Sequence, residues 1–180
     1  MMEILQDIMK EITSVLEKVD KDQFTSFISG IDKNKRIFVD GEGRSGLMAK
    51  GFAMRLMHLG YTVYVIGETI TPAMEKEDIF IAVSGSGESP NTLNDAGKAV
   101  KAGCRVLAVT SKPSSSLASL ADSVLVVPGT VKSEQGDARA SVQLLSSLFD
   151  QTLHITLDAA CLMISRRDRF SNEEATKKHW

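Results

Sequence analysis

The sequence predicts an α/β fold in which helices cover both faces of a parallel β-sheet, and three observations lead to this prediction. Short apolar runs alternate with longer amphipathic segments along most of the 180 residues. The run Ile79–Val83 is apolar without a break, which is typical of a strand buried on both faces. Two glycine-rich loops follow directly after two of the runs, at the sheet edge where parallel α/β folds bind ligands.

Two helices are expected ahead of the sheet. Residues 1–19 carry apolar side chains at steps of three and four, which indicates an amphipathic helix. A second helix is expected over residues 22–31. Such a pair must bury its apolar side either on the α/β core or on another subunit.

The remaining elements alternate between strand and helix. The expected strands are residues 36–40, 61–66, 78–83, 105–109 and 123–127. The expected helices are residues 47–59, 90–102, 117–121, 147–165 and 172–178. Residues 128–146 have no clear period and predict a mobile loop. We expect one domain, with a helical extension over 1–31, a core over 32–165 and a C-terminal tail over 166–180.

Composition and charge exclude several classes of partner. The net charge of −2 provides no basic surface, so no nucleic-acid partner is expected. Cys104 and Cys161 lack metal-ligand spacing and predict buried thiols in a reducing compartment. The first residues lack the layout of a signal peptide, and no apolar run is long enough to span a membrane. We therefore expect a cytoplasmic protein without a membrane partner.

The loop Ser84-Gly85-Ser86-Gly87-Glu88-Ser89 predicts an anion site. Gly85 and Gly87 let the backbone turn tightly and approach a ligand. The three serines add hydroxyl groups, and the helix that follows aims free N–H groups at the same point. The alternative is an ordinary turn in which a serine caps the helix. Three serines and two glycines exceed what a cap needs, so phosphate binding is favoured.

The earlier glycine-rich loop, residues 41–46, raises the question of a nucleotide cofactor. Gly41-x-Gly43-x-x-Gly46 has the form of a dinucleotide fingerprint. The acidic residue that would bind the ribose is absent from residues 60–65, and no Gly-Lys-Ser/Thr motif for nucleotide phosphates is present. No nucleotide cofactor is therefore expected.

Together the two loops resemble the SIS (sugar isomerase) domain family. Longer stretches of the sequence resemble the 6-phospho-3-hexuloisomerases within that family. These stretches are 43–50, 52–60, 65–69, 141–143, 147–153 and the ending Lys178-His179. The sequence departs from the pattern of the family at Leu144-Leu145-Ser146, where Pro-Met-Gly is usual, and at Asp150, where glutamate is usual.

The resemblance implies a flavodoxin-like three-layer sandwich with a five-stranded parallel sheet. It implies a cofactor-independent isomerase, without metal, that interconverts 3-hexulose 6-phosphate and fructose 6-phosphate through an enediolate, as in the ribulose monophosphate pathway of formaldehyde assimilation. A homotetramer is also implied. Two alternatives stay open: an isomerase of another phosphosugar, such as arabinose 5-phosphate, and a non-catalytic phosphosugar sensor.

The resemblance also implies roles for particular residues. Phosphate contacts are expected from Ser45 and from the loop residues Ser84, Gly85, Ser86, Gly87, Glu88 and Ser89. Arg44 is expected to reach the phosphate or a sugar hydroxyl, unless it pairs with Glu42 or Glu68.

The expected base is Asp150, which would carry the proton between carbons. The alternative is a capping box, Ser147-x-x-Asp150, in which the carboxylate only caps its helix. His58 and His179 are candidates for moving hydroxyl protons. The alternative for His58 is a core or interface histidine, and a role for His179 requires the tail to dock.

Overall fold

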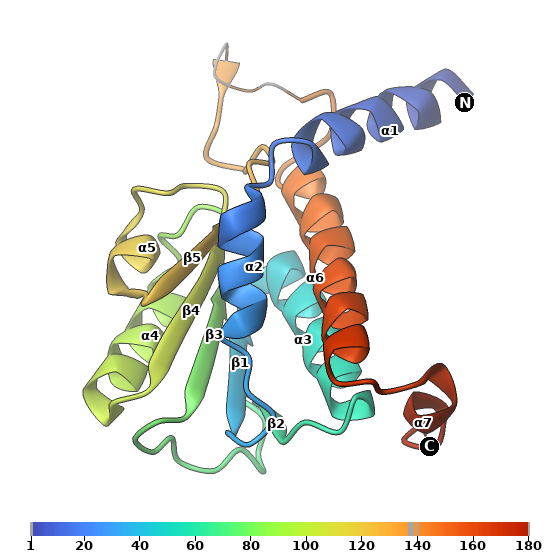
Figure 1. Cartoon of the computed structure of the whole chain (residues 1–180). Coiled ribbons are helices and arrows are strands. Elements are labelled where there is room, and N and C mark those ends of the chain that lie inside the picture. Colours follow the sequence, from blue (N-terminus) through green and yellow to red (C-terminus); the bar gives the residue numbers. More distant parts are fainter. Residues whose placement is uncertain (1, 137–138, 140, 180) are drawn as a thin grey trace.

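In a computed structural model, which describes residues 2–136, 139 and 141–179, the chain forms a parallel sheet between two layers of helices (Figure 1). The strands are β1 (Ile37–Gly41), β2 (Val63–Val65), β3 (Ile79–Val83), β4 (Arg105–Thr110) and β5 (Ser123–Val126). Their order is β2-β1-β3-β4-β5, and every neighbouring pair is parallel. This is the flavodoxin-like order, so the predicted fold class is confirmed.

The helices divide between the two faces of the sheet. They are α1 (Met2–Leu16), α2 (Lys21–Ser29), α3 (Gly43–His58), α4 (Pro90–Ala102), α5 (Ser116–Leu120), α6 (Ser147–Arg167) and α7 (Asn172–Thr176). Helices α2, α3 and α6 cover one face and α4 and α5 the other, while α1 crosses the start of α6 (Figure 1). No helix in the described part of the chain has the length and apolarity needed to cross a bilayer.

The core explains the unbroken apolar runs. Side chains alternate between the two faces along each strand. Val39 of β1 therefore packs in the cluster that contains Phe52 of α3, and Phe38 packs on the opposite side with Phe80. Because both faces of β1 and β3 are covered, each strand needs apolar residues at consecutive positions.

Helix α3 begins four residues earlier than the sequence predicts. Glu42 has extended backbone angles, and its carbonyl accepts a hydrogen bond from Gly46 N at 3.0 Å, so the helix starts at Gly43. This start places Arg44 and Ser45 in the first helical turn instead of in a loop. The described residues of the segment 128–146 form no α-helix or β-strand, as expected.

The topology brings the two glycine-rich loops together. The chain leaves β1 for β2 on one side, and β3 lies on the other side of β1. Crevices form where the strand order reverses in this way, at the carboxyl ends of the strands. The loops after β1 and β3 therefore meet at one point of the sheet edge.

Candidate active site

A cavity of about 320 Å³ lies at this edge, under the segment that joins β5 to α6. Its walls come from the loops after β1 and β3, from the segment before α6 and from the first turn of α6. The lining residues are Glu42, Gly43, Arg44, Ser45, Gly85, Ser86, Ser89, Val131, Lys132, Leu145, Ser146, Ser147 and Asp150.

Three helices point their N-termini at this cavity. They are α3, α4 and α6, which begin after Glu42, Ser89 and Ser146, and all three of these residues line the wall. In the part of the chain that the structure describes, none of these three residues caps its own helix through its side chain. Helix N-termini carry free N–H groups and a positive dipole end, so their convergence favours a bound anion.

The N-terminus of α4 differs from the expectation in one respect. The side chain of Glu42 reaches across from the β1 loop, and its Oε1 accepts hydrogen bonds from Asn91 N at 2.9 Å and Thr92 N at 3.3 Å. The expectation that α4 offers these amides to a ligand is therefore wrong, because a carboxylate of the chain itself takes them.

The serines of the 84–89 loop hold its shape. Ser84 Oγ lies 2.9 Å from Ser89 Oγ and accepts a hydrogen bond from Gly87 N at 3.1 Å. Gly87 has φ of 69°, and a Cβ there would lie 2.1 Å from Ser115 Oγ, so only glycine fits. Ser84 is buried behind the wall, while Ser86 and Ser89 line the cavity.

Glu88, Gly87 and Ser84 are not among the residues that line the cavity. The Oε1 of Glu88 accepts a hydrogen bond from Ser116 N at 2.7 Å, so this carboxylate caps α5. The hydrogen bond from the Ser116 backbone lowers the pKa of Glu88. Glu88 and Gly87 thus contribute to the anchoring and the shape of the loop.

Asp150 is the buried carboxylate of the cavity, with 2% of its surface exposed. Its Oδ1 accepts a hydrogen bond from Ser45 Oγ at 2.7 Å, and its Oδ2 lies 3.9 Å from Arg44 Nε. Burial raises the pKa of Asp150, while Ser45 and Arg44 act in the opposite direction. The carboxylate is therefore a stronger base than an exposed aspartate.

The structure does not show the alternative roles, in which Asp150 caps its own helix and Arg44 pairs with Glu42 or Glu68. Asp150 lies in the first turn of α6 but turns toward α3 and does not cap its own helix. Arg44 also reaches α6, where its Nη1 donates to Ser147 Oγ at 3.0 Å. Glu42 instead caps α4, and Glu68 pairs with Lys50 at 3.0 Å.

The two candidate histidines lie away from the cavity within one chain. His58 is the last residue of α3, about 20 Å from its first residue at 1.5 Å per residue. Its ring stacks on that of His179, with centroids 5.3 Å apart. Burial lowers the pKa of His58, and the nearby Arg55 and His179 lower it further. A single chain thus brings Arg44, Ser45 and Asp150 together but leaves the histidines at the opposite sheet edge.

The segment before α6 supplies cavity residues that the sequence did not reveal. Lys132 and Ser146 both line the wall, and Lys132 N donates to Ser146 Oγ at 3.1 Å. Leu145 has φ of 52° and lines the wall as well. Two serines before an apolar helix are a recognisable signal of a helix start, but no pattern in the sequence identifies Lys132.

Helix α1 holds this segment in place. The Oε1 of Glu11 accepts from Val142 N at 2.8 Å, and its Oε2 accepts from Ser141 Oγ at 2.9 Å and from Gln143 Nε2 at 3.0 Å. One carboxylate of α1 therefore anchors the chain that leads into the cavity wall. Among the described residues, no group of three His, Cys, Asp or Glu side chains is placed to hold a metal ion.

The comparisons with known proteins identify a family and named relatives. The SIS domain family model matches residues 30–155. The 3-hexulose-6-phosphate isomerase of Mycobacterium gastri is 38% identical over 94% of this chain and 84% of that protein. The enzyme of the same name from Bacillus subtilis is 34% identical over 98% of this chain and 96% of that protein.

A crystal structure of another protein has a similar fold and sequence. It is of a Methanococcus jannaschii protein, for which the molecular function of 3-hexulose-6-phosphate isomerase was inferred. The two folds have a TM-score of 0.82 and 32% identity, over 99% of this chain and 98% of that one. Since the family model covers most of the chain and the relatives match nearly all of it, the chain belongs to the SIS domain family.

Proposed function

We propose that this protein is an isomerase that interconverts 3-hexulose 6-phosphate and fructose 6-phosphate. The observation that carries the proposal is one cavity in which the N-termini of α3 and α6 meet a buried carboxylate beside the serines of the 84–89 loop, while Glu42 occupies the N-terminus of α4. The helix ends favour a phosphate, and the carboxylate is placed for proton transfer. The relatives that bear the name 3-hexulose-6-phosphate isomerase support this choice of substrate.

The phosphate is proposed to bind to the hydroxyls of Ser86 and Ser89, to the first amides of α3, that of Ser45 included, and to amides of α6 that follow Ser147. Ser45 Oγ donates its one hydrogen to Asp150, and Ser147 N donates to Leu144 O at 3.0 Å, so neither of these two groups is a phosphate donor in this proposal. Lys132 adds a positive charge on the same wall. Gly85 lines the cavity beside these serines, and Ser84 supports the loop from behind the wall. Such an arrangement holds a dianion through many weak contacts, with no need for a basic surface.

The reaction moves a carbonyl from C3 to C2 of the sugar. Asp150 is proposed to take the proton from C2, which gives an enediolate, and to return it to C3, while the hydroxyl proton moves from O2 to O3 so that the carbonyl ends at C2. Its raised pKa suits the first step, because a stronger base removes a carbon-bound proton more readily. Arg44, whose Nε lies 3.9 Å from Asp150 Oδ2, is placed to stabilise the negative charge of the enediolate.

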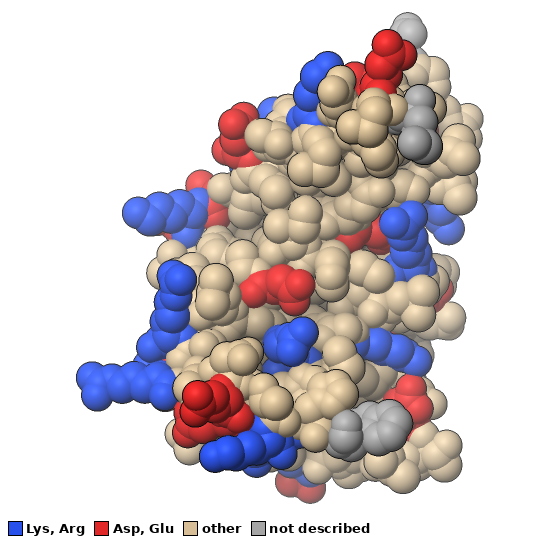
Figure 2. Space-filling model, turned by 90° about the vertical axis from the view of Figure 1, so that its right-hand side faces the viewer, with Lys and Arg blue, Asp and Glu red and all other residues tan. Residues whose placement is uncertain are grey.

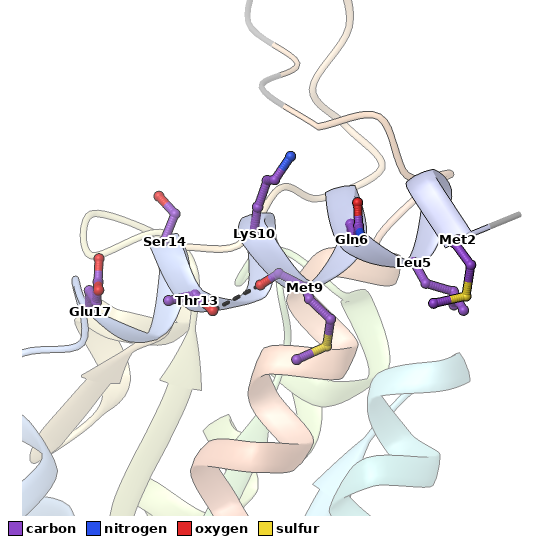
Figure 3. Close-up of a pocket in the computed structure, with 8 residues that line it drawn as sticks. All are labelled: Met2, Leu5, Gln6, Met9, Lys10, Thr13, Ser14 and Glu17. Atoms are coloured by element: carbon purple, nitrogen blue, oxygen red, sulfur yellow. Dashed lines mark hydrogen bonds between the residues drawn. The ribbon is translucent and has the colours of Figure 1, made fainter.

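The protein is proposed to act as a homo-oligomer, and the sequence resemblance implies a tetramer. Met2, Leu5 and Met9 are exposed by 63%, 51% and 59% and lie along one side of α1 (Figure 3). On the face drawn in Figure 2, charged side chains of both signs are scattered over a mostly uncharged surface. In an oligomer, the exposed His179 of one chain would be available to the cavity of another, whereas His58 is 3% exposed and would become available only if the tail that carries His179 moved.

The test supplies purified protein with 3-hexulose 6-phosphate and follows the formation of fructose 6-phosphate. Asp150→Asn is expected to lower kcat by at least about a hundredfold, the usual contribution of a general base, while sugar phosphate binding persists. Asp158→Asn is the matched control, because Asp158 lies on the same helix and is exposed.

The other outcomes each decide against one part of the proposal. Full activity of Asp150→Asn would show that another group is the base. Turnover of arabinose 5-phosphate in place of the hexulose would identify a different SIS isomerase. Tight binding of either sugar without turnover would identify a sensor.

A further inference from the structure

Glu42 places a negative charge in a cavity that otherwise favours anions. It lines the wall beside Ser86 and Ser89, and its Oε1 accepts from the amides of Asn91 and Thr92. These amides belong to the first turn of α4, which directly follows the loop of residues 84–89. The carboxylate therefore occupies the end of the helix that would attract a phosphate most directly.

The chemistry of the proposed reaction does not use this charge. The proposed base is Asp150, which is buried, and the positively charged residues that line the cavity are Arg44 and Lys132. The backbone of Glu42 also starts α3, so the residue joins two of the three helix N-termini. A neutral side chain such as glutamine would accept the same two hydrogen bonds.

We propose that Glu42 is a resident anion that sets the affinity of the cavity for phosphate. It neutralises the end of α4 and repels an incoming dianion, so that it weakens the binding of inorganic phosphate and of the sugar phosphate alike. The inference rests on the proposed function, because it assumes that the ligand carries a phosphate group.

Electrostatics gives the size of the change in phosphate affinity that the charge of Glu42 causes. A unit charge on the wall of a partly exposed cavity changes the affinity for a dianion by about tenfold, and salt reduces the change. The charge acts on the bound substrate and on the transition state alike, so it alters KM and leaves kcat nearly unchanged.

The experiment measures the dissociation constant of inorganic phosphate by calorimetry for the wild-type protein, Glu42→Gln and Glu42→Ala. Both variants are expected to bind phosphate about tenfold more tightly, and the gain should shrink at high salt. The KM for 3-hexulose 6-phosphate should fall with kcat unchanged. Glu42→Gln preserves the acceptor for Asn91 and Thr92, so it tests the charge even if Glu42→Ala fails to fold.

Asp20→Asn is the matched control. Asp20 caps α2 through Gln23 N at 2.8 Å, and α2 packs on β5, two strands away from β3. Asparagine also caps helices well, so this variant removes one charge without removing the cap. Phosphate affinity should stay at the wild-type value.

The sign of the change decides the inference. A structural role alone predicts that both variants lose stability and bind phosphate more weakly or equally, and that result would overturn the proposal. Failure of the proposed function looks different, because the wild-type protein would then not convert 3-hexulose 6-phosphate, whatever the sign of the change in phosphate affinity.

Discussion

Asp150 has a protonation equilibrium that serves the reaction at the expense of the fold. Burial raises the pKa of Asp150, so the folded chain holds the proton more tightly than the unfolded chain does. The free energy of unfolding therefore falls as pH rises between the pKa of the unfolded chain and that of the folded chain. Above this range the ionised carboxylate lowers stability, and this is the form that the proposed reaction needs.

The hydrogen bond from Ser45 limits this shift, which leads to a prediction about pH. Ser45 Oγ donates to Asp150 Oδ1 and so favours the charged form. In Ser45→Ala, the pKa of Asp150 should rise further, and the acid limb of kcat/KM should move to higher pH. A pH profile of the isomerase reaction checks this expectation.

Ser147→Ala is the control for this profile. Ser147 accepts a hydrogen bond from Arg44, whereas Asp150 Oδ1 is bound by Ser45. The acid limb should therefore stay where it is in the wild-type protein. An acid limb that stays in place in Ser45→Ala as well would show that Asp150 does not govern it.

The sequence identified part of this site and missed part. Arg44, Ser45 and Asp150 were predicted from family motifs, and the structure places them within contact of one another. The side-chain contact between Glu42 and α4 was not predicted, because it joins residues almost 50 positions apart. Such a contact depends on which loops the strand order brings together, and the sequence of neither loop predicts the strand order.

At the scale of elements, Phe149 holds the start of α6 in place by packing on Gly85 of the 84–89 loop. Phe149 lies next to Asp150 and is fully buried. A Cβ on Gly85 would lie 2.9 Å from Phe149 Cδ1, and one on Gly129 would lie 2.6 Å from Phe149 Cα. The two glycines thus leave room for the first turn of α6, and this contact sets the place of the carboxylate.

Gly85→Ala tests this contact. The added methyl group would also lie 2.8 Å from Val131 Cγ1, so the loop and α6 must move apart. We expect a loss of about 1–3 kcal/mol in the free energy of unfolding, the usual effect of overpacking a core. Urea denaturation measures it, and a lower kcat would accompany it.

Gly97→Ala is the matched control, since Gly97 lies in α4 and a Cβ there meets nothing within 4 Å. It should stabilise the protein by about 0.5–1 kcal/mol, because alanine is the better helix former. If the two variants changed stability alike, the contact with Phe149 would have no energetic role.

Most elements were predictable because their periods are strong. The helix at 90–102 has its predicted bounds, and each expected strand is present within two residues at each end. The start of α3 was not predictable, since Gly43 and Gly46 are weak helix formers and only the fold holds them in a helix. The segment before α6 lacks a period, because it forms no helix or strand and is held by separate contacts such as those of Glu11 with residues 141–143.

For the whole molecule, α1 is the element that one chain leaves incompletely covered. Its residues Ile12 and Val15 are buried, but Met2, Leu5 and Met9 are exposed. In the proposed homo-oligomer, Leu5→Glu should shift the protein toward smaller assemblies, because the charge would have to be buried. Light scattering coupled to size-exclusion chromatography measures the mass.

Val100→Glu is the control for this shift. Val100 is 45% exposed, but it lies on α4, on the other face of the sheet from α3 and α6. The mass should be that of the wild-type protein. A wild-type protein that is monomeric at every concentration would contradict the proposed oligomer.

The contact between Glu11 and the 141–143 segment has a further consequence if α1 is an interface. The same helix would then bind a neighbouring chain through Leu5 and Met9 and hold the cavity wall through Glu11. Assembly would become part of building the active site, and mass action would govern both. The specific activity is then expected to fall on dilution, even though every cavity residue named above belongs to a single chain.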